Sequence, residues 1–329
     1  MRITILFGGS NKERLVSVAS AQALHRALPD AELWFWDVRD DVYRVRSEAL
    51  LGHARPFEDE FVPGGTGVTL ERALDAAKAE ERLLVLGLHG GRAENGELQA
   101  MCELRGIPFT GSGSAASHLA FDKVAAKRFA ALAGVNVPPG VALQDVDRAL
   151  AEHGRLIAKP SRDGSSYGLI FVNGTQDLVA VRAAAATEEY VIEPFVSGVE
   201  TTCGVLERAD GTVIALPPVE IVPAEGAFDY AAKYLAATTQ EICPGRFPPA
   251  IAARIMDDAL RAHRALSCRG YSRTDFIVSG EKPVYLETNT LPGLTAASLY
   301  TKALHAQGIG FSDFLRDQIA LAEKAIRQA

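Results

Sequence analysis

The stretch ITILFGG at residues 3–9 decides the first part of the fold. A short apolar run that ends in two glycines is typical of a buried strand followed by a turn. An Ala/Leu-rich helical pattern follows to about residue 28, and further strands are predicted at 33–38 (LWFWDV) and 83–90 (LLVLGLHG). Alternating strands and helices indicate a parallel sheet covered by helices. Residues 45–80 are interrupted by Gly, Pro and acidic residues, and their pattern predicts little.

The second half of the chain has a different pattern, which favours an α+β arrangement. Long alternating runs between 201 and 222 suit antiparallel strands. One long helix is predicted from 115 to 133, ending at Gly134. Other strands are predicted at 155–160, 169–172, 190–195, 271–278 and 283–289, and helices near 249–267 and 312–327.

Composition excludes several classes of protein. The 329 residues carry a net charge of −7 and form no basic stripe, so a nucleic-acid partner is not expected. No apolar run approaches the ~20 residues that span a bilayer, and the first one is too short for a signal peptide. The four cysteines are widely spaced without a C-x-x-C pair. Free thiols in a cytoplasmic protein are therefore expected, rather than disulfides or a zinc ribbon.

Two glycine-rich segments are candidate phosphate loops. GSGSAA at 111–116 fits the dinucleotide pattern, but no acidic residue follows at the distance that binds ribose, so a structural turn between domains is favoured. KPSRDGSSYG at 159–168 places Lys159 at a strand end before a Gly/Ser loop. Backbone amides and hydroxyls in such a loop can hold phosphate oxygens. An ordinary hairpin turn is the alternative, and the pattern alone leaves both open.

A third group of residues predicts a metal site. Glu287 and Asn289 lie two positions apart on one strand and share a face, and Asp275 lies on the neighbouring strand. Two carboxylates and an amide suit Mg²⁺ completed by water and nucleotide phosphates, whereas the alternative is a solvated strand face.

The segment HGGRAENG at 89–96 also follows the end of an apolar strand. A lone His89 there is more often structural, and Glu94 and Asn95 are interpreted as caps of the next helix.

The order of these motifs resembles the D-alanine–D-alanine ligases of the ATP-grasp superfamily. The resemblance implies an N-terminal α/β domain with a parallel sheet over 1–111. A two-domain ATP-grasp fold would follow, with a central subdomain at 112–193, a C-terminal subdomain at 194–329 and ATP between them. The matching segments are LFGGSNKERLVS (6–17), LHGGRAENGELQ (88–99), IPFTGSGSAASHLAFDK (107–123), 159–168, VIEPFVSGVE (191–200), FDYAAKY (228–234), CRGYSRTDF (268–276) and LETNTLPGLTAASL (286–299).

The same resemblance implies roles for individual residues. The residues implied to bind ATP are Lys123, Lys159, Ser166, Glu193, Pro194, Val196, Glu200 and Lys233. Two Mg²⁺ ions, for which Mn²⁺ could substitute, would be held by Asp275, Glu287 and Asn289. The residues implied for the two D-alanines and the oxyanion are Glu13, Ser165 and Tyr234 at the first amino group, His89 near the first substrate, Ser298 and Leu299 beside the second, and Arg273 with the Gly293 amide as oxyanion hole.

The activity implied by the resemblance is the ATP-dependent joining of two D-alanines through an acyl phosphate, for peptidoglycan synthesis, by a cytoplasmic homodimer. A ligase for other amino acids and a nucleotide-binding paralogue without turnover are the alternatives. Departures from the usual family pattern occur at Leu15, Asp163, Tyr167, 245–246 and Tyr300. These departures leave the ATP and metal residues intact, so they bear on amino-acid specificity more than on reaction class.

Overall fold

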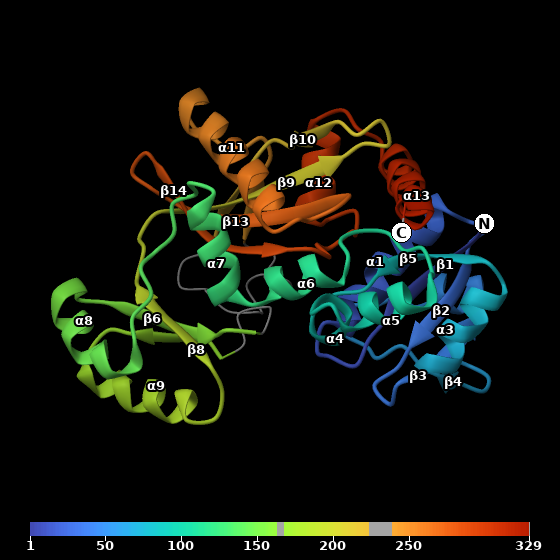
Figure 1. Cartoon of the computed structure of the whole chain (residues 1–329), viewed down its shortest axis with the longest axis horizontal. Helices are drawn as coiled ribbons and strands as arrows, with labels where there is room; N and C mark the ends of the chain where they lie inside the picture. Colours follow the sequence, from blue (N-terminus) through green and yellow to red (C-terminus); the bar gives the residue numbers. More distant parts are fainter. Residues whose placement is uncertain (163–167, 224–238, 329) are drawn as a thin grey trace.

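Three β-sheets organise the protein in a computed structural model that describes residues 1–162, 168–223 and 239–328 (Figure 1). The first sheet has the order β4-β3-β2-β1-β5. Its strands β1 (Arg2–Gly8), β2 (Glu32–Trp36) and β5 (Arg82–Gly87) are parallel, which confirms the predicted sheet. Strands β3 (Asp41–Val45) and β4 (Val68–Thr69) extend it antiparallel at one edge. The helices of this part are α1 (Arg14–Ala27), α2 (Ser47–Leu51), α3 (Leu70–Ala79), α4 (Gly91–Glu94) and α5 (Glu97–Arg105).

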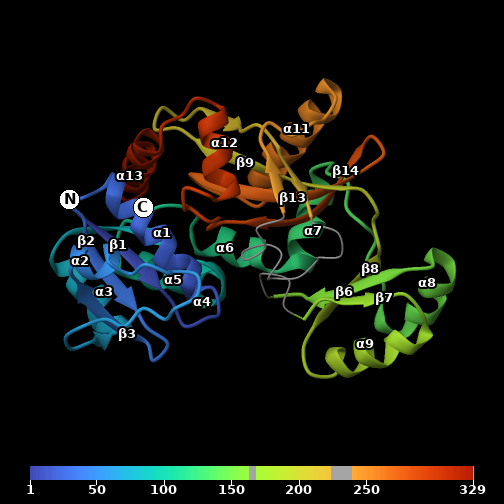
Figure 2. The same ribbon diagram turned by 180° about the vertical axis from the view of Figure 1, so that it is seen from behind.

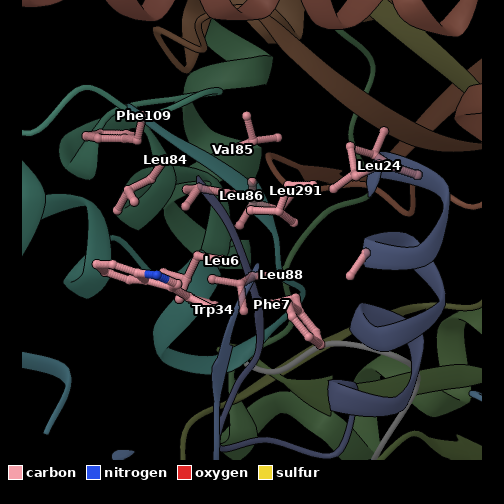
Figure 3. Close-up of a cluster of buried hydrophobic side chains, with 14 of the residues drawn as sticks. Leu6, Phe7, Leu24, Trp34, Leu84, Val85, Leu86, Leu88, Phe109 and Leu291 are labelled. Atoms are coloured by element: carbon pink, nitrogen blue, oxygen red, sulfur yellow. The ribbon is translucent and has the colours of Figure 1, made fainter. Parts of the chain in front are cut away.

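Burial on both faces explains the continuous apolar strands of this first sheet. In β1, Ile5, Leu6 and Phe7 are all buried, as expected for a parallel strand covered by helices on each side. Each such side chain contributes about 1.5–3 kcal/mol when it leaves water. Leu291, from the far end of the chain, belongs to the same cluster and lies beside Leu86 (Figure 3). The C-terminal part is thus packed directly onto the N-terminal core.

The second sheet is small and has a core of its own. Strands β6 (Leu156–Pro160), β7 (Ile170–Val172) and β8 (Tyr190–Pro194) pair antiparallel in the order β7-β6-β8. The elements that accompany them are the 3₁₀ turns at Leu143–Asp145 and Thr175–Asp177 and the helices α8 (Val146–His153) and α9 (Leu178–Ala185). The apolar cluster of these elements shares no residue with the other two clusters.

The third sheet is antiparallel and forms the C-terminal part. Its order is β12-β11-β9-β13-β14, with β10 paired to β9. The strands are β9 (Val199–Glu207), β10 (Val213–Ala215), β11 (Val219–Val222), β12 (Gln240–Ile242), β13 (Tyr271–Ser279) and β14 (Lys282–Asn289). The helices are α11 (Pro249–Ala265), α12 (Leu299–Ala306) and α13 (Phe311–Gln328). Seen from behind, α13 lies against the N-terminal part of the chain (Figure 2).

The prediction of a single helix from 115 to 133 is wrong, because the helix is interrupted at Asp122. The structure has α6 (Ser114–Phe121) and α7 (Lys123–Leu132) instead. The Asp122 carboxylate accepts the backbone N–H groups of Val124 and Ala125, both at 3.0 Å, and so caps the second helix. Both helices contribute alanines to the apolar cluster of the C-terminal sheet. The predicted end at Gly134 is confirmed by its φ of +82°.

Candidate active site

Two neighbouring strands of the C-terminal sheet present the predicted metal ligands side by side. In the register of β13 and β14, Asp275 lies opposite Glu287 and Arg273 lies opposite Asn289. A bulge follows directly after Asp275. The predicted grouping of these residues is confirmed, while their roles stay predictions.

Asp275 is the centre of a buried polar cluster. Arg273 donates to both of its oxygens, from Nε at 2.9 Å and Nη2 at 2.8 Å. Thr202 Oγ donates at 2.6 Å and Asn289 Nδ2 at 3.2 Å. A bidentate arginine and two further donors hold the carboxylate in one orientation. Strands β9, β13 and β14 are thereby joined at this point.

The donor chemistry here fits Mg²⁺. Asp275, Glu287 and Asn289 offer hard oxygen atoms, the type of ligand that Mg²⁺ prefers. Within the described ranges no group of three or more His, Cys, Asp or Glu side chains could hold a metal. The predicted set has two carboxylates and one amide. Sparse ligation of this kind is typical of sites that water and phosphate oxygens complete. Lys123 Nζ lies 3.4 Å from Glu287 Oε2 and adds a positive charge beside them.

A second charged cluster lies between α7 and the central sheet. Lys127, one turn after Lys123, forms an ion pair with Glu193 Oε1 on β8. Lys159, at the end of β6, has its Nζ 3.8 Å from Glu193 Oε2. Burial and the nearby charge of Lys159 lower the pKa of Lys127 to about 7, against the opposing effect of Glu193. The sequence analysis named Lys123, Lys159 and Glu193 but not Lys127.

The predicted adenine and ribose residues follow the connection between the central and C-terminal sheets. Glu193 and Pro194 end β8, Val196 lies in the loop, and Glu200 is the second residue of β9. The Arg155 guanidinium stacks over the Phe195 ring with 4.1 Å between the guanidinium carbon and the ring centroid. This contact fixes the loop that joins the two sheets.

Glu13 and His89, predicted to meet the first substrate, lie at adjacent N-terminal loops. Asn11 joins the loops, because its Nδ2 donates to the His89 carbonyl at 2.6 Å and its Oδ1 accepts the Glu13 N–H at 2.9 Å. Gly90 has a φ of +62°, and a Cβ there would overlap the Glu13 carboxylate. Glycine is therefore required at this position both by conformation and by space.

His89 is held by hydrogen bonds at both ring nitrogens. Nδ1 lies 2.8 Å from the Leu291 carbonyl oxygen and Nε2 lies 2.8 Å from Ser20 Oγ. Burial lowers the pKa of His89 to about 4, so the ring is neutral near pH 7. A carbonyl only accepts, so Nδ1 carries the proton and Nε2 accepts from Ser20. This arrangement agrees with the expectation from the sequence that a lone His89 has a structural role.

Glu94 does not cap the following helix α5, contrary to the sequence interpretation. Its Oε1 accepts the backbone N–H groups of Thr290 and Leu291, and its Oε2 accepts that of Gly90. Burial, with the nearby charge of Glu13, raises the pKa of Glu94 to about 7. Asn95, by contrast, accepts the Glu97 N–H at 3.0 Å at the start of α5, as predicted. The sequence analysis missed this role of Glu94, because its partners Thr290 and Leu291 are 196 and 197 positions away.

The residues predicted beside the second D-alanine lie where β14 leads into α12. Ser298 and Leu299 begin α12, and a Cβ on Gly293 would lie 2.8 Å from Ser298 Oγ. Tyr300 is buried in the core, and its hydroxyl donates to the Val205 carbonyl at 2.9 Å. The departure at Tyr300 is thus a matter of core packing. Ser165, Ser166, Lys233 and Tyr234, with Asp163 and Tyr167, lie outside the described residues.

Comparison with known proteins identifies the family. The profile described as "D-ala D-ala ligase N-terminus" matches residues 2–112, and the one described as "D-ala D-ala ligase C-terminus" matches residues 149–320. The D-alanine–D-alanine ligase of Desulforudis audaxviator is 36% identical, with 98% of this chain and 99% of that protein covered. The chain belongs to the D-alanine–D-alanine ligase family. A family member from Oleidesulfovibrio alaskensis, named D-alanine–D-alanine ligase, is 38% identical, with 98% and 96% covered.

Solved structures of D-alanine–D-alanine ligases and of a D-Ala:D-Ser ligase share this fold. The VanG D-Ala:D-Ser ligase of Enterococcus faecalis superposes with a TM-score of 0.78 at 28% identity, covering 98% of this chain and 99% of that one. The Coxiella burnetii D-alanine–D-alanine ligase gives 0.81 at 23% identity, covering 100% and 95%. The Bacillus anthracis D-alanine–D-alanine ligase complexed with ATP gives 0.74 at 23% identity, covering 100% and 99%. The predicted ATP-grasp fold is confirmed.

Proposed function

We propose that this protein joins two D-alanines to D-alanyl-D-alanine at the expense of ATP, for peptidoglycan synthesis. The observation that carries this proposal is the cluster in which Arg273 and Asn289 hold Asp275 opposite Glu287. Nucleotide binding alone has no need of a partly buried arginine beside the acidic pair. A ligase needs such a donor for the charge that develops during acyl transfer.

The first step activates a carboxylate, which is a poor electrophile. One oxygen of the first D-alanine carboxylate attacks the γ-phosphorus of ATP. ADP is the leaving group, and the product of this step is an acyl phosphate. Phosphoryl transfer depends on positioning and on offsetting negative charge. Lys123 and Lys159 are the described residues assigned to the phosphates, with Ser166 and Lys233 completing the set. Bound Mg²⁺ would be held by Asp275, Glu287 and Asn289 and would supply further charge neutralisation.

The second step forms the peptide bond. The amine of the second D-alanine loses a proton and attacks the acyl carbon, and phosphate leaves from the tetrahedral intermediate. Arg273 and the Gly293 N–H are assigned to the oxyanion. Glu13, with Ser165 and Tyr234, is assigned to the amino group of the first D-alanine, and His89 to its surroundings. Ser298 and Leu299 are assigned to the second D-alanine.

Product analysis tests the proposed function directly. The purified protein is incubated with ATP, Mg²⁺ and D-alanine, phosphate release is followed, and the product is identified by mass. Parallel reactions contain D-serine, D-lactate or the corresponding L-amino acids. D-alanyl-D-alanine with stoichiometric phosphate is the expected result. Turnover only with another pair of acids would assign the protein to a different ligase, and ATP binding without any turnover would contradict a ligase.

The metal assignment has a separate test. Glu287→Ala removes one of the two carboxylates that suit Mg²⁺, so Mg-dependent ATP binding should weaken. Calorimetric titration with ATP, with and without Mg²⁺, measures the change. Equal Mg²⁺ enhancement of ATP binding in the variant and the wild type would count against the role of Glu287.

The domain limits and the assembly belong to the same proposal. Each of the predicted segments 1–111, 112–193 and 194–329 contains one of the three sheets apart from Pro194, the last residue of β8, which supports the division, although α6 and α7 pack against the third sheet. A cytoplasmic homodimer is proposed from the family resemblance. Among the described helices, none has the length and apolarity to cross a bilayer. Light scattering on the purified protein tests the dimer.

A further inference from the structure

Lys127 is a buried lysine that the proposed reaction does not yet use. Only 6% of its surface is exposed, although it lies in an otherwise amphipathic helix. Lysine is almost never buried to this extent unless it is paired, because removing an ammonium group from water is costly. Its partner Glu193 is 2% exposed and is bound through Oε1. The buried ammonium and carboxylate groups therefore stabilise each other.

The pair connects two separately packed parts of the protein. Helix α7 contributes to the apolar cluster of the C-terminal sheet, whereas β8 contributes to that of the central sheet. In both views α7 lies between these two parts, next to β6 and β8 (Figures 1 and 2). An ordinary surface ion pair would contribute little here. A buried pair across a junction instead fixes where the carboxylate points.

The two oxygens of Glu193 have different surroundings. Oε1 accepts from Lys127, whereas Lys159 Nζ is 3.8 Å from Oε2, which is beyond hydrogen-bond distance. An ionised carboxylate only accepts hydrogen bonds, so Oε2 retains capacity for an N–H donor of a ligand. The 6-amino group of adenine is such a donor, whereas a 6-oxopurine presents an acceptor at the same position.

We propose that Lys127 is a positioning residue that orients the carboxylate of Glu193 through Oε1, so that Oε2 favours the amino group of a 6-aminopurine over the oxo group of a 6-oxopurine. The inference rests on the proposed function, because it places the base of ATP at Glu193. Without Lys127 the carboxylate loses its hydrogen bond at Oε1, while Lys159 stays 3.8 Å from Oε2, so the carboxylate turns toward Lys159 and away from the base. A carboxylate turned in this way no longer accepts from the 6-amino group, so the preference for ATP is lost.

The experiment measures binding of ATP and of inosine triphosphate by calorimetry, with Mg²⁺ and without D-alanine. Lys127→Met keeps the length of the side chain and removes its charge. The expected result is ATP binding weakened about 10- to 100-fold, the value of a hydrogen bond to a charged group, with inosine triphosphate binding nearly unchanged. Lys127→Gln is the second variant, which keeps a donor without charge, and Lys127→Arg restores the charge and should recover part of the selectivity.

Arg128 offers a matched control on the same helix. It is the next residue and is exposed, so Arg128→Met removes an equal charge from the solvent side of α7. This variant should keep the wild-type ratio of the two affinities. In Lys127→Met, the KM for ATP should rise while the KM for D-alanine at saturating ATP stays the same. A general structural defect would move both.

A double-mutant cycle decides whether Lys127 acts through Glu193. Glu193→Gln should reduce selectivity by itself, and adding Lys127→Met should then change the ratio little, because interacting residues are not additive. Additive effects, or wild-type selectivity in both Lys127→Met and Lys127→Gln, would overturn the inference. A wild-type protein that binds neither nucleotide would instead contradict the proposed function, so the two failures are distinguishable.

Discussion

Glu94 accepts a hydrogen bond from the backbone N–H of Leu291 at 3.0 Å, although 197 positions separate the two residues. The same oxygen accepts the Thr290 N–H at 2.9 Å. His89 donates in the opposite direction, from Nδ1 to the Leu291 carbonyl at 2.8 Å. Both backbone groups of Leu291 are therefore held by the N-terminal part of the chain. The segment that leads to Gly293, the proposed oxyanion donor, takes its position from these contacts.

Glu94→Gln should lower the rate of ligation while leaving ATP binding close to wild type. An amide places a donor where the carboxylate has an acceptor, so at least one of the three buried N–H groups loses its partner. An unsatisfied buried group costs about 1–3 kcal/mol, which corresponds to roughly a 5- to 150-fold loss in kcat if it displaces the oxyanion donor. Steady-state kinetics with D-alanine and calorimetry with ATP measure the two effects. Glu97→Gln, at an exposed position on α5, is the control.

Arg273→Ala should abolish most ligation but retain ATP binding. Loss of one donor to an oxyanion typically lowers kcat by about 100- to 1,000-fold. Arg273→Lys keeps the charge but cannot make the two-point contact with Asp275, so it should be closer to alanine than to wild type. Rapid-quench assays of product, alongside ATP titration, measure both properties. Wild-type ligation by the alanine variant would show that the oxyanion assignment is wrong.

The strands of the fold were predictable because burial leaves a continuous signature in the sequence. Strands β1, β2, β5, β6 and β8 all occur where apolar runs predict them. The break at Asp122 was not predictable from periodicity, since the apolar pattern continues through it and the capping bonds form only once the chain turns. The antiparallel strands β3 and β4 were missed because they are short and partly exposed.

The candidate site was predictable where chemistry follows strand geometry. Asp275, Glu287 and Asn289 meet as predicted because a strand has a fixed alternation and β13 pairs with β14. Lys127 was missed for the opposite reason. In the sequence it reads as one of several charges on an exposed helix face, and its burial comes from the approach of β8, more than sixty positions away. Glu94 likewise acquires its role from residues near position 290.

Asp122→Ala should destabilise the protein and weaken ATP binding together. The carboxylate caps α7 and also accepts two hydrogen bonds from Arg162, at 2.9 and 2.7 Å. Loss of an N-cap costs about 0.5–2 kcal/mol. The first turns of α7 carry Lys123 and Lys127, so fraying there loosens both contacts. Urea unfolding and ATP titration test this, with Asp122→Asn as the control that keeps a capping acceptor. Unchanged stability in the alanine variant would contradict the capping role.

Stability should decrease as the pH falls from about 6.5 to about 4, partly because of His263. This side chain is buried, with Nδ1 2.7 Å from Ser272 Oγ, and burial lowers its pKa to about 4. An unfolded histidine has a pKa near 6.5, so the unfolded state binds the proton first and is favoured in this window. The stability that depends on a neutral His263 is fully present above pH 6.5. Lowering the pH through the whole window removes about 3 kcal/mol of it. Burial also lowers the pKa of His89 to about 4, so this residue likewise reduces the stability as the pH falls.

The slope of stability against pH isolates the contribution of His263. In His263→Asn the side chain no longer titrates, so the free energy of unfolding should fall less between pH 7 and pH 5, by about 2 kcal/mol. The absolute stability of this variant is lower at both pH values, because the Asn side chain fills the site incompletely, and only the slope is compared. His305→Asn, at an exposed position on α12, should leave the slope unchanged. Equal slopes in wild type and His263→Asn would mean that the pKa of His263 is the same in the folded and unfolded states, and would contradict the lowered value.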